Sequence, residues 1–278
     1  MECTSWDVYE VFGLERAGEG GRLTAWRSVT PPTVSGRRRR PAVLILPGGG
    51  YEHISARESE PVALRFLARG WVPFVLDYSV APVRFPAQLR EGAMAMRFIR
   101  ENADAFEVDP GMVAAVGFSA GGHLCGTLAT MFDAPEVQDI APAEVLRPDA
   151  VGLCYPVAVS WGDTHSASFA NLCGSDRPLA ERLSLDRLVR PDMPPVYLWT
   201  TRDDGSVPCR NTLLLAQALD SAGVDFALRV YRHGKHGLAT ADAQAFPTGD
   251  MPAFSPEIAR WPEEMMDFFA ESGLMVHD

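Results

Sequence analysis

The chain has 278 residues, of which 47% are hydrophobic and 22% charged, and its formal net charge is −11. This composition is ordinary for a globular protein with a sizeable core, and the acidic balance argues against nucleic acid or an anionic membrane surface as a partner. The first residues lack the basic and apolar regions of a signal peptide, and no apolar run approaches 18 residues, so we predict a cytoplasmic protein without a membrane-spanning segment.

The predicted secondary structure alternates continuous apolar runs with amphipathic ones, which indicates an α/β fold with a mostly parallel central sheet and helices on both faces. The first thirty residues are predicted to form an antiparallel edge hairpin, because Leu23, Ala25 and Arg27 alternate with their neighbours. We find no internal repeat or linker, so residues 1–278 are expected to form a single domain. Strands are predicted at 42–46, 71–77, 112–116, 151–155, 196–200 and 226–230, and helices at 61–69, 86–102, 122–131, 211–222 and 261–269.

Two predicted connections, around 156–195 and 239–256, are longer than a sheet connection requires. Each follows a predicted strand and therefore leaves the carboxyl end of the sheet, where ligands bind in open α/β folds. Long loops in a compact domain are usually functional or partly disordered. We therefore expect both segments to form walls of a substrate pocket.

The sequence Gly117-Phe118-Ser119-Ala120-Gly121 lies between a predicted strand and a predicted helix, which is the context of a nucleophile elbow. The turn is too tight for side chains at the two flanking positions, and glycine occupies both. Such a turn presents the Ser119 hydroxyl at the helix N-terminus, where backbone N–H groups can stabilise a developing oxyanion. Ser119 is the predicted nucleophile.

A serine nucleophile needs a base, and the base needs a carboxylate that orients it. The carboxylate candidates are Asp203 and Asp204, directly after the predicted strand 196–200. The spacing Asp-x-x-Val-Pro favours Asp204, and Asp203 is then interpreted as a solvated or turn-capping residue.

The base candidates are His233 and His236, on the loop after the last predicted strand. His236 lies between small residues that leave it free to approach the serine, whereas His233 is closer to the strand end and is expected to bond locally. His123 follows Ser119 by one helical turn and is expected to pack under the elbow.

The oxyanion donors are suggested by Pro47-Gly48-Gly49-Gly50-Tyr51, after the predicted strand 42–46. Glycines there let backbone N–H groups turn inward without a clash of side chains. We predict that Gly49, Gly50 and Ala120 supply the N–H groups. A plain glycine-rich turn or a phosphate loop is the alternative, but neither dinucleotide nor P-loop spacing is present.

These segments, in this order, resemble the α/β-hydrolase superfamily, and specifically its carbohydrate-esterase-like group of acetylxylan, feruloyl and related acyl esterases. Further similar stretches are Asp77–Ser79, Phe85–Pro86, Gly117–Leu124 and Tyr155–Val157, and the resemblance spans about residues 20–270. The chain also resembles the hormone-sensitive-lipase branch, but has Pro47 where that branch has histidine. This departure leaves the oxyanion role intact, because that role uses backbone groups.

The resemblance implies an α/β-hydrolase fold and a serine esterase that acts on short acyl esters, such as acetyl groups on carbohydrate, through an acyl-enzyme intermediate. It also implies that no cofactor is needed. The five cysteines lack metal-site spacing and are interpreted as reduced thiols. A serine peptidase, an arylformamidase and a catalytically silent binding protein are the alternatives. The candidates for substrate contact are Tyr51, His53, Trp161, His165 and Phe169.

Overall fold

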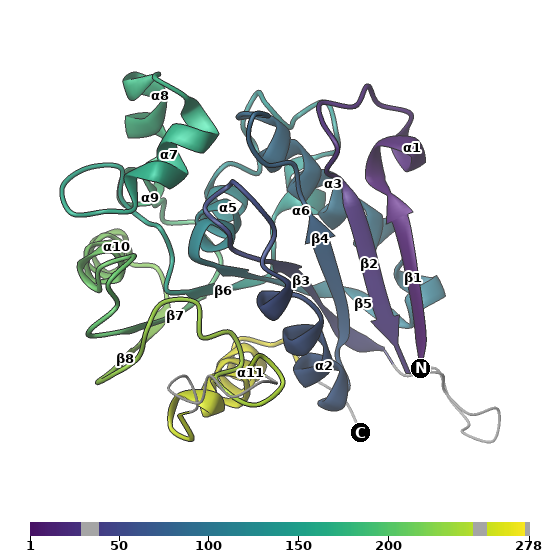
Figure 1. Cartoon of the computed structure of the whole chain (residues 1–278). Coiled ribbons are helices and arrows are strands. Elements are labelled where there is room, and N and C mark those ends of the chain that lie inside the picture. The colour runs from purple at the N-terminus through teal and green to yellow at the C-terminus, as the bar shows by residue number, and fades with distance from the viewer. Residues whose placement is uncertain (29–38, 247–254, 276–278) are drawn as a thin grey trace.

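The computed structural model describes residues 1–28, 39–246 and 255–275, and its centre is an eight-stranded sheet (Figure 1). All strands of the predicted pattern are present, most of them within two residues of their predicted ends. The strands are β1 (Glu2–Asp7), β2 (Arg22–Arg27), β3 (Arg40–Leu46), β4 (Val72–Asp77), β5 (Val108–Phe118), β6 (Ala150–Cys154), β7 (Val196–Thr201) and β8 (Phe226–Tyr231).

The sheet has the strand order β1-β2-β4-β3-β5-β6-β7-β8. β1 pairs with β2, and β2 with β4, in antiparallel register, whereas all pairs from β4 to β8 are parallel. The predicted edge hairpin is therefore confirmed, with the short helix α1 (Val8–Phe12) between its strands. Because β3 to β8 run in parallel, their carboxyl ends meet at one edge, which is where an α/β sheet places its ligand site.

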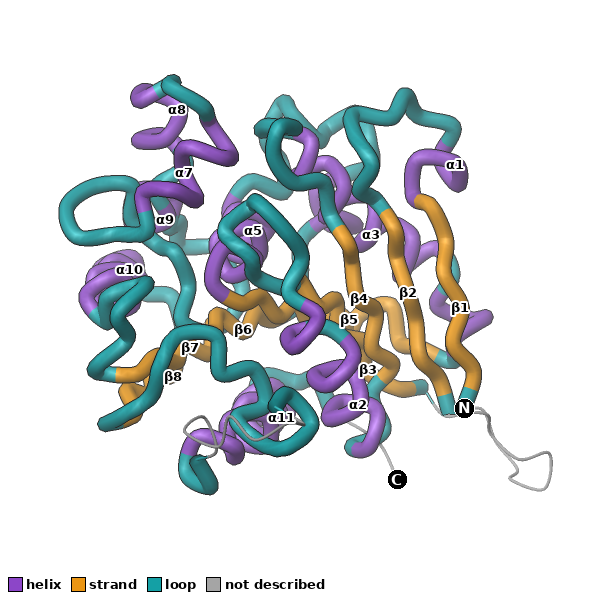
Figure 2. Tube along the Cα trace, viewed as in Figure 1, coloured by secondary structure: helices purple, strands orange, loops and turns teal. Residues whose placement is uncertain are grey.

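Helices cover both faces of the sheet, as Figure 2 shows and as the alternation along β3 requires. Leu44 and Leu46 pack in the core with α3 (Ala87–Glu101), α5 (Ser119–Thr130) and α10 (Arg210–Ala222), whereas Val43 and Ile45 pack with α2 (Glu60–Ala68) and α11 (Trp261–Glu271). Replacing a fully buried leucine such as Leu44 by alanine costs about 2–5 kcal/mol.

The predicted wall segment 156–195 is not an open loop, because it contains three short helices: α7 (Ser166–Cys173), α8 (Arg177–Arg182) and α9 (Leu185–Leu188). Helices of one or two turns are too short for a periodicity to stand out in the sequence. The Asp176 side chain caps α8 by accepting from the Leu179 N–H at 2.9 Å. Part of the second predicted wall, residues 247–254, lies outside the described residues. Two further short helices are α4 (Ala103–Phe106) and α6 (Ala143–Leu146).

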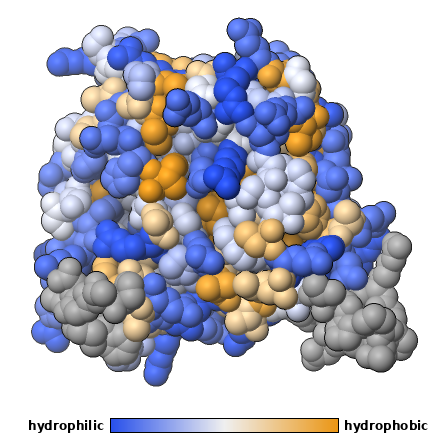
Figure 3. Space-filling model, turned by 45° about the vertical axis from the view of Figure 1, so that its right-hand side comes forward, coloured by the Kyte–Doolittle hydropathy of each residue, from blue (hydrophilic) through white to orange (hydrophobic). Residues whose placement is uncertain are grey.

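On the face drawn in Figure 3, hydrophobic residues lie in small groups separated by hydrophilic ones. Within the described ranges, no helix is both long and apolar enough to cross a lipid bilayer. The cytoplasmic location and the single-domain organisation stay predictions.

Candidate active site

Three predicted side chains meet at the carboxyl end of the sheet, in one hydrogen-bonded chain. His236 Nδ1 lies 2.7 Å from Asp204 Oδ2, and His236 Nε2 lies 2.8 Å from Ser119 Oγ. A carboxylate only accepts, so Nδ1 donates to Asp204 and Nε2 of the neutral ring is left to accept from the Ser119 hydroxyl. This orientation prepares the serine for proton transfer to the histidine.

The elbow between β5 and α5 has the tight geometry that the glycines indicate. Ser119 has a positive φ of 53°, a backbone conformation that non-glycine residues rarely adopt. A Cβ at Gly117 would lie 2.1 Å from the Gly121 carbonyl oxygen, and one at Gly121 would lie 2.1 Å from the Leu46 oxygen. Neither position therefore accommodates a side chain, and the prediction of obligatory flanking glycines is confirmed. The helix α5 begins at Ser119, three residues before its predicted start.

Asp204 is fixed by the turn that follows β7. Its Oδ1 accepts from the N–H groups of Ser206 and Val207, each at 2.9 Å, which leaves Oδ2 for His236. The neighbouring Asp203 points elsewhere and bonds to Gly234 N at 2.7 Å and His233 Nδ1 at 3.1 Å. The Gly234 N–H and then His233 lower the pKa of Asp203 below its usual value. The structure thus joins Asp204, and not Asp203, to the serine.

The predicted oxyanion donors lie beside Ser119. Gly49 and Gly50 have positive φ values of 124° and 67°, and neither N–H has a hydrogen-bond partner among the described residues. The N–H of Ala120 is in the first turn of α5, where backbone donors have no intrahelical acceptor. The third glycine differs, because the N–H of Gly48 donates to Glu58 Oε2 at 2.7 Å. Gly49, Gly50 and Ala120 are therefore the amides that remain available to an oxyanion.

These groups border a polar cavity of about 300 Å³. His53 and His165 line it, as predicted for substrate contact. Burial lowers the pKa of His165, and the nearby His236 lowers it further. The lining residues are Gly49, Gly50, Glu52, His53, Ser55, Arg57, Glu58, Ser119, His165, Ser206, His236 and Gly237.

Three residues predicted as candidates for substrate contact do not line this cavity. Tyr51 is 1% exposed and its hydroxyl lies 2.8 Å from His123 Nδ1, so it packs under the elbow together with that histidine. Phe169 is also buried and contacts the His123 ring edge-on. Trp161 lies outside the cavity at the surface, where its Nε1 donates to Asp186 at 3.0 Å. Tyr51, Phe169 and Trp161 therefore lie outside the lining of this cavity, and their contact with substrate stays a prediction.

Two residues that the sequence did not single out hold the oxyanion loop, which is the glycine segment 48–50 that carries two of the predicted oxyanion donors. Asn171 of α7 donates to the Gly50 carbonyl oxygen at 2.9 Å, and Glu58 bonds to Gly48. Asn171 lies within the predicted pocket wall, which is the one signal that pointed to its neighbourhood. Glu58 follows the glycines by a few residues, but nothing in the local pattern distinguishes it from a solvated acid.

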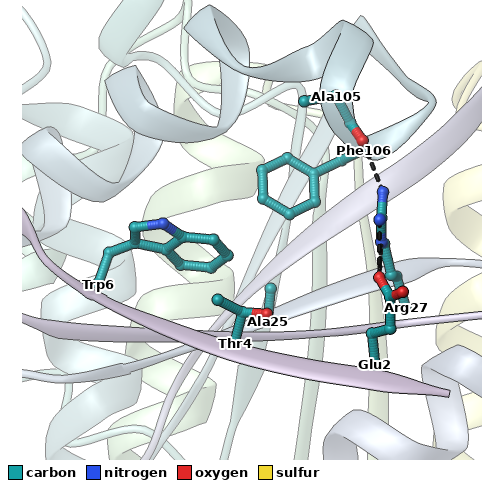
Figure 4. A pocket seen from close by; sticks show the side chains of 7 residues that line it. All are labelled: Glu2, Thr4, Trp6, Ala25, Arg27, Ala105 and Phe106. Atoms are coloured by element: carbon teal, nitrogen blue, oxygen red, sulfur yellow. Dashed lines mark hydrogen bonds and ion pairs between the residues drawn. The ribbon is translucent and has the colours of Figure 1, made fainter.

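A second cavity of about 210 Å³ lies at the β1 edge of the sheet (Figure 4). Trp6 and Phe106 form its apolar wall, and Arg27 bonds to Glu2 and to the Ala105 carbonyl oxygen. Its lining comes from β1, β2 and α4, which carry no residue of the Ser119 site. In the parts of the chain that the structure describes, no group of three or more His, Cys, Asp and Glu side chains is arranged to hold a metal ion.

Comparison with known proteins places this geometry in a family. A family model described as BD-FAE matches residues 30–145, and the model of the prolyl oligopeptidase family matches residues 95–257, which is more than half of the chain. The chain is 38% identical over 220 residues to endo-1,4-beta-xylanase B of Butyrivibrio fibrisolvens, and 31% identical over 217 residues to an acetylxylan esterase of Xylanibacter ruminicola. Both alignments cover 75% of this chain but only 34% and 42% of those proteins, so the chain spans less than half the length of these curated relatives.

Solved structures extend the similarity to nearly the whole chain. An acetyl ester-xyloside bifunctional hydrolase from Caldicellulosiruptor lactoaceticus is 34% identical, with a TM-score of 0.79 over 91% of this chain and 89% of that one. A carboxylesterase from Lactobacillus plantarum is 27% identical, with a TM-score of 0.84 and full coverage of both chains. The chain therefore belongs to the α/β-hydrolase superfamily, in its carbohydrate-esterase-like group, as its motifs predict.

Proposed function

We propose that the protein is a serine esterase that removes short acyl groups, and acetyl groups in particular, from carbohydrate. The observation that carries this proposal is the continuous hydrogen-bonded chain from Asp204 through His236 to Ser119. This chain borders a cavity that is also lined by Gly49 and Gly50, whose backbone N–H groups have no partner among the described residues. Such a chain activates a hydroxyl for attack on a carboxylic ester.

In the first half of the reaction, Ser119 Oγ attacks the ester carbonyl carbon and its proton passes to His236 Nε2. The negative charge that develops on the carbonyl oxygen is stabilised by the N–H groups of Gly49, Gly50 and Ala120. His236 then gives the proton to the departing sugar oxygen, and the acyl group remains on Ser119. Water, deprotonated by His236, hydrolyses this acyl-enzyme and restores the serine.

Two features favour a small acyl group on a sugar. The cavity of about 300 Å³ is small, which suits an acetyl group better than a long acyl chain. Its wall carries Glu52, Arg57 and Ser206, whose polar groups can bond to sugar hydroxyls. Relatives described as an acetylxylan esterase and an acetyl ester-xyloside hydrolase support the same class of substrate.

The test measures hydrolysis of p-nitrophenyl acetate, butyrate and octanoate beside acetylated xylo-oligosaccharides, with the wild type and Ser119→Ala. Serine-dependent release of acetate from both the aryl ester and the oligosaccharide is expected, with activity falling from acetate to octanoate. Equal rates for all three aryl esters would contradict the short-acyl preference. Activity that persists in Ser119→Ala would contradict the nucleophile.

The match to the prolyl oligopeptidase family model favours amide hydrolysis as a second candidate. The same groups cleave an amide if the leaving amine receives the proton from His236. Peptide p-nitroanilides and N-formyl aryl amines assayed beside the esters separate the two activities. A kcat/KM for an amide above that for p-nitrophenyl acetate would replace the esterase proposal.

A further inference from the structure

Glu58 is a buried carboxylate that connects the glycine loop 48–50 to Tyr155, whose ring packs against His236. It ends the short 3-10 helix Ala56–Glu58 and is 2% exposed. Its Oε2 accepts from the Gly48 N–H at 2.7 Å, and its Oε1 accepts from the Tyr155 hydroxyl, also at 2.7 Å. A buried carboxylate persists where such donors satisfy it, so these two contacts define its environment.

The first contact holds the oxyanion loop. Gly48 precedes Gly49 and Gly50, which line the cavity, and its own N–H donates to Glu58. A Cβ at Gly48 would lie 2.7 Å from Glu58 Oε2 and 2.9 Å from Ser119 Cβ. Glu58, Gly48 and Ser119 therefore pack closely against one another. A shift of the Glu58 carboxylate is then expected to shift Gly48 and the two glycines that follow it.

The second contact reaches the histidine loop through Tyr155, the residue after β6. The Tyr155 hydroxyl donates to Glu58 and accepts from the Ala239 N–H at 3.0 Å. Its ring contacts the His236 ring edge-on, with centroids 5.0 Å apart. Burial raises the pKa of Tyr155 well above its usual value, so the phenol keeps the proton that it donates. One tyrosine thus fixes both the His236 ring and the backbone that follows it.

We infer that Glu58 is a positioning residue for acyl transfer: through Gly48 and Tyr155 it sets the distance between the oxyanion donors and the catalytic histidine. Glu58 acts through these neighbours and takes no proton from the substrate. The inference rests on the proposed esterase function. The physical reason is that the oxyanion donors and His236 must contact the same tetrahedral intermediate. A displacement of either by about 1 Å lowers the rate of the reaction strongly.

The chain contains a matched control at Glu91. This glutamate of α3 is also fully buried, and it also accepts from a tyrosine hydroxyl (Tyr9, 2.8 Å) and from a backbone N–H (Ser79, 2.6 Å). Its partners lie on α1 and just after β4, and it does not line the cavity around Ser119. Comparing the two sites separates positioning from the general cost of a damaged buried carboxylate.

The experiment compares Glu58→Gln, Tyr155→Phe and their double variant with Glu91→Gln and Tyr9→Phe, using p-nitrophenyl acetate. Active sites are counted with a fluorophosphonate, so that kcat refers to folded, labelled enzyme. We expect kcat to fall about 10- to 100-fold in Glu58→Gln and Tyr155→Phe with KM changed less than about twofold, because the loss appears in the transition state. The double variant should lose less than the product of the two single losses, since both act in one network.

A second measurement tests whether the loss of kcat comes from displaced oxyanion donors. Affinity for an arylboronic acid, which forms a tetrahedral adduct on serine, should fall in parallel with kcat/KM in the two Glu58-network variants and stay unchanged in Glu91→Gln and Tyr9→Phe. The controls are expected to lower the unfolding midpoint only. Unchanged kcat in folded Glu58→Gln, or an equal loss in Glu91→Gln, would overturn the inference. Failure of the esterase proposal itself is distinguishable, because wild type would then show no Ser119-dependent turnover.

Discussion

Two aspartate–histidine pairs lie side by side at the carboxyl end of this sheet, and they differ in burial. Asp204 pairs with His236 at 2.7 Å, with side chains 1% and 19% exposed, whereas Asp203 pairs with His233 at 3.1 Å, with side chains 52% and 72% exposed. Both aspartates also accept from backbone N–H groups. The residue types, the loops and the pairing geometry are therefore nearly the same.

What separates the pairs is the atom on the far side of each histidine. His236 Nε2 lies 2.8 Å from Ser119 Oγ beside the cavity, whereas the His233 side chain is 72% exposed. Exposed charge pairs are worth about 0–1 kcal/mol because water screens them, while a buried carboxylate orients its partner strongly. An Asp–His pair is thus a component of a catalytic site only where a nucleophile completes it.

Removing the nucleophile is the change with the largest expected effect. Ser119→Ala deletes the attacking oxygen and leaves the His236–Asp204 pair without a substrate for proton transfer. We expect kcat for p-nitrophenyl acetate to fall by about 10⁵- to 10⁶-fold, as for other serine hydrolases. A circular-dichroism spectrum and unfolding midpoint like those of the wild type show that the fold survives. Residual turnover within about tenfold of the wild type would sink the assignment.

The next largest effect tests the buried pair directly. Asp204→Asn keeps the shape of the side chain but removes the charge that holds His236 in the productive tautomer, so kcat should fall by about 10⁴-fold. Steady-state kinetics with p-nitrophenyl acetate measure it. A loss smaller than that of Asp203→Asn would reverse the comparison between the two pairs.

A third histidine extends this contrast, because His123 is buried and has no carboxylate partner among the described residues. Burial lowers the pKa of His123 from 6.5 to about 4. The unfolded chain therefore binds this proton first, so the free energy of unfolding is unaffected above pH 6.5 and falls between pH 6.5 and 4, by up to about 1.4 kcal/mol per pH unit. Urea unfolding of the wild type and His123→Gln at pH 7, 5.5 and 4.5 measures this. The variant should be less stable at pH 7 but lose less stability on acidification; parallel curves would contradict the prediction.

The smallest effect is expected at the exposed pair. Asp203→Asn and His233→Ala each remove one member of a solvent-screened pair that has no contact with Ser119. We expect kcat/KM to stay within about twofold of the wild type and the unfolding midpoint to stay close to that of the wild type. Kinetics beside Asp204→Asn provide the internal scale. A tenfold loss of kcat in Asp203→Asn would show that the turn after β7 tolerates no change.

Features that depend on neighbours along the chain can be predicted from the sequence alone. Continuous apolar runs gave the parallel strands, because such strands are buried on both faces. The glycines around Ser119 revealed the elbow, since steric exclusion at Gly117 and Gly121 is local to one turn. Chain order limited the acid and the base to two candidates each. The helices within 156–195 escaped prediction, because they are too short to show a period.

Which of the candidate side chains meet depends on the tertiary structure. Asp204 and His236 are 32 residues apart and Ser119 is 117 residues from His236, so their distances depend on how β5, β7 and β8 align in the sheet. The same dependence hid Glu58, whose partners lie 10 and 97 residues away, and it turned Tyr51 into the core. Local patterns record sterics and burial within one element, whereas a site is made of contacts between elements, and those form only when the strands align in the sheet and the helices pack on its two faces.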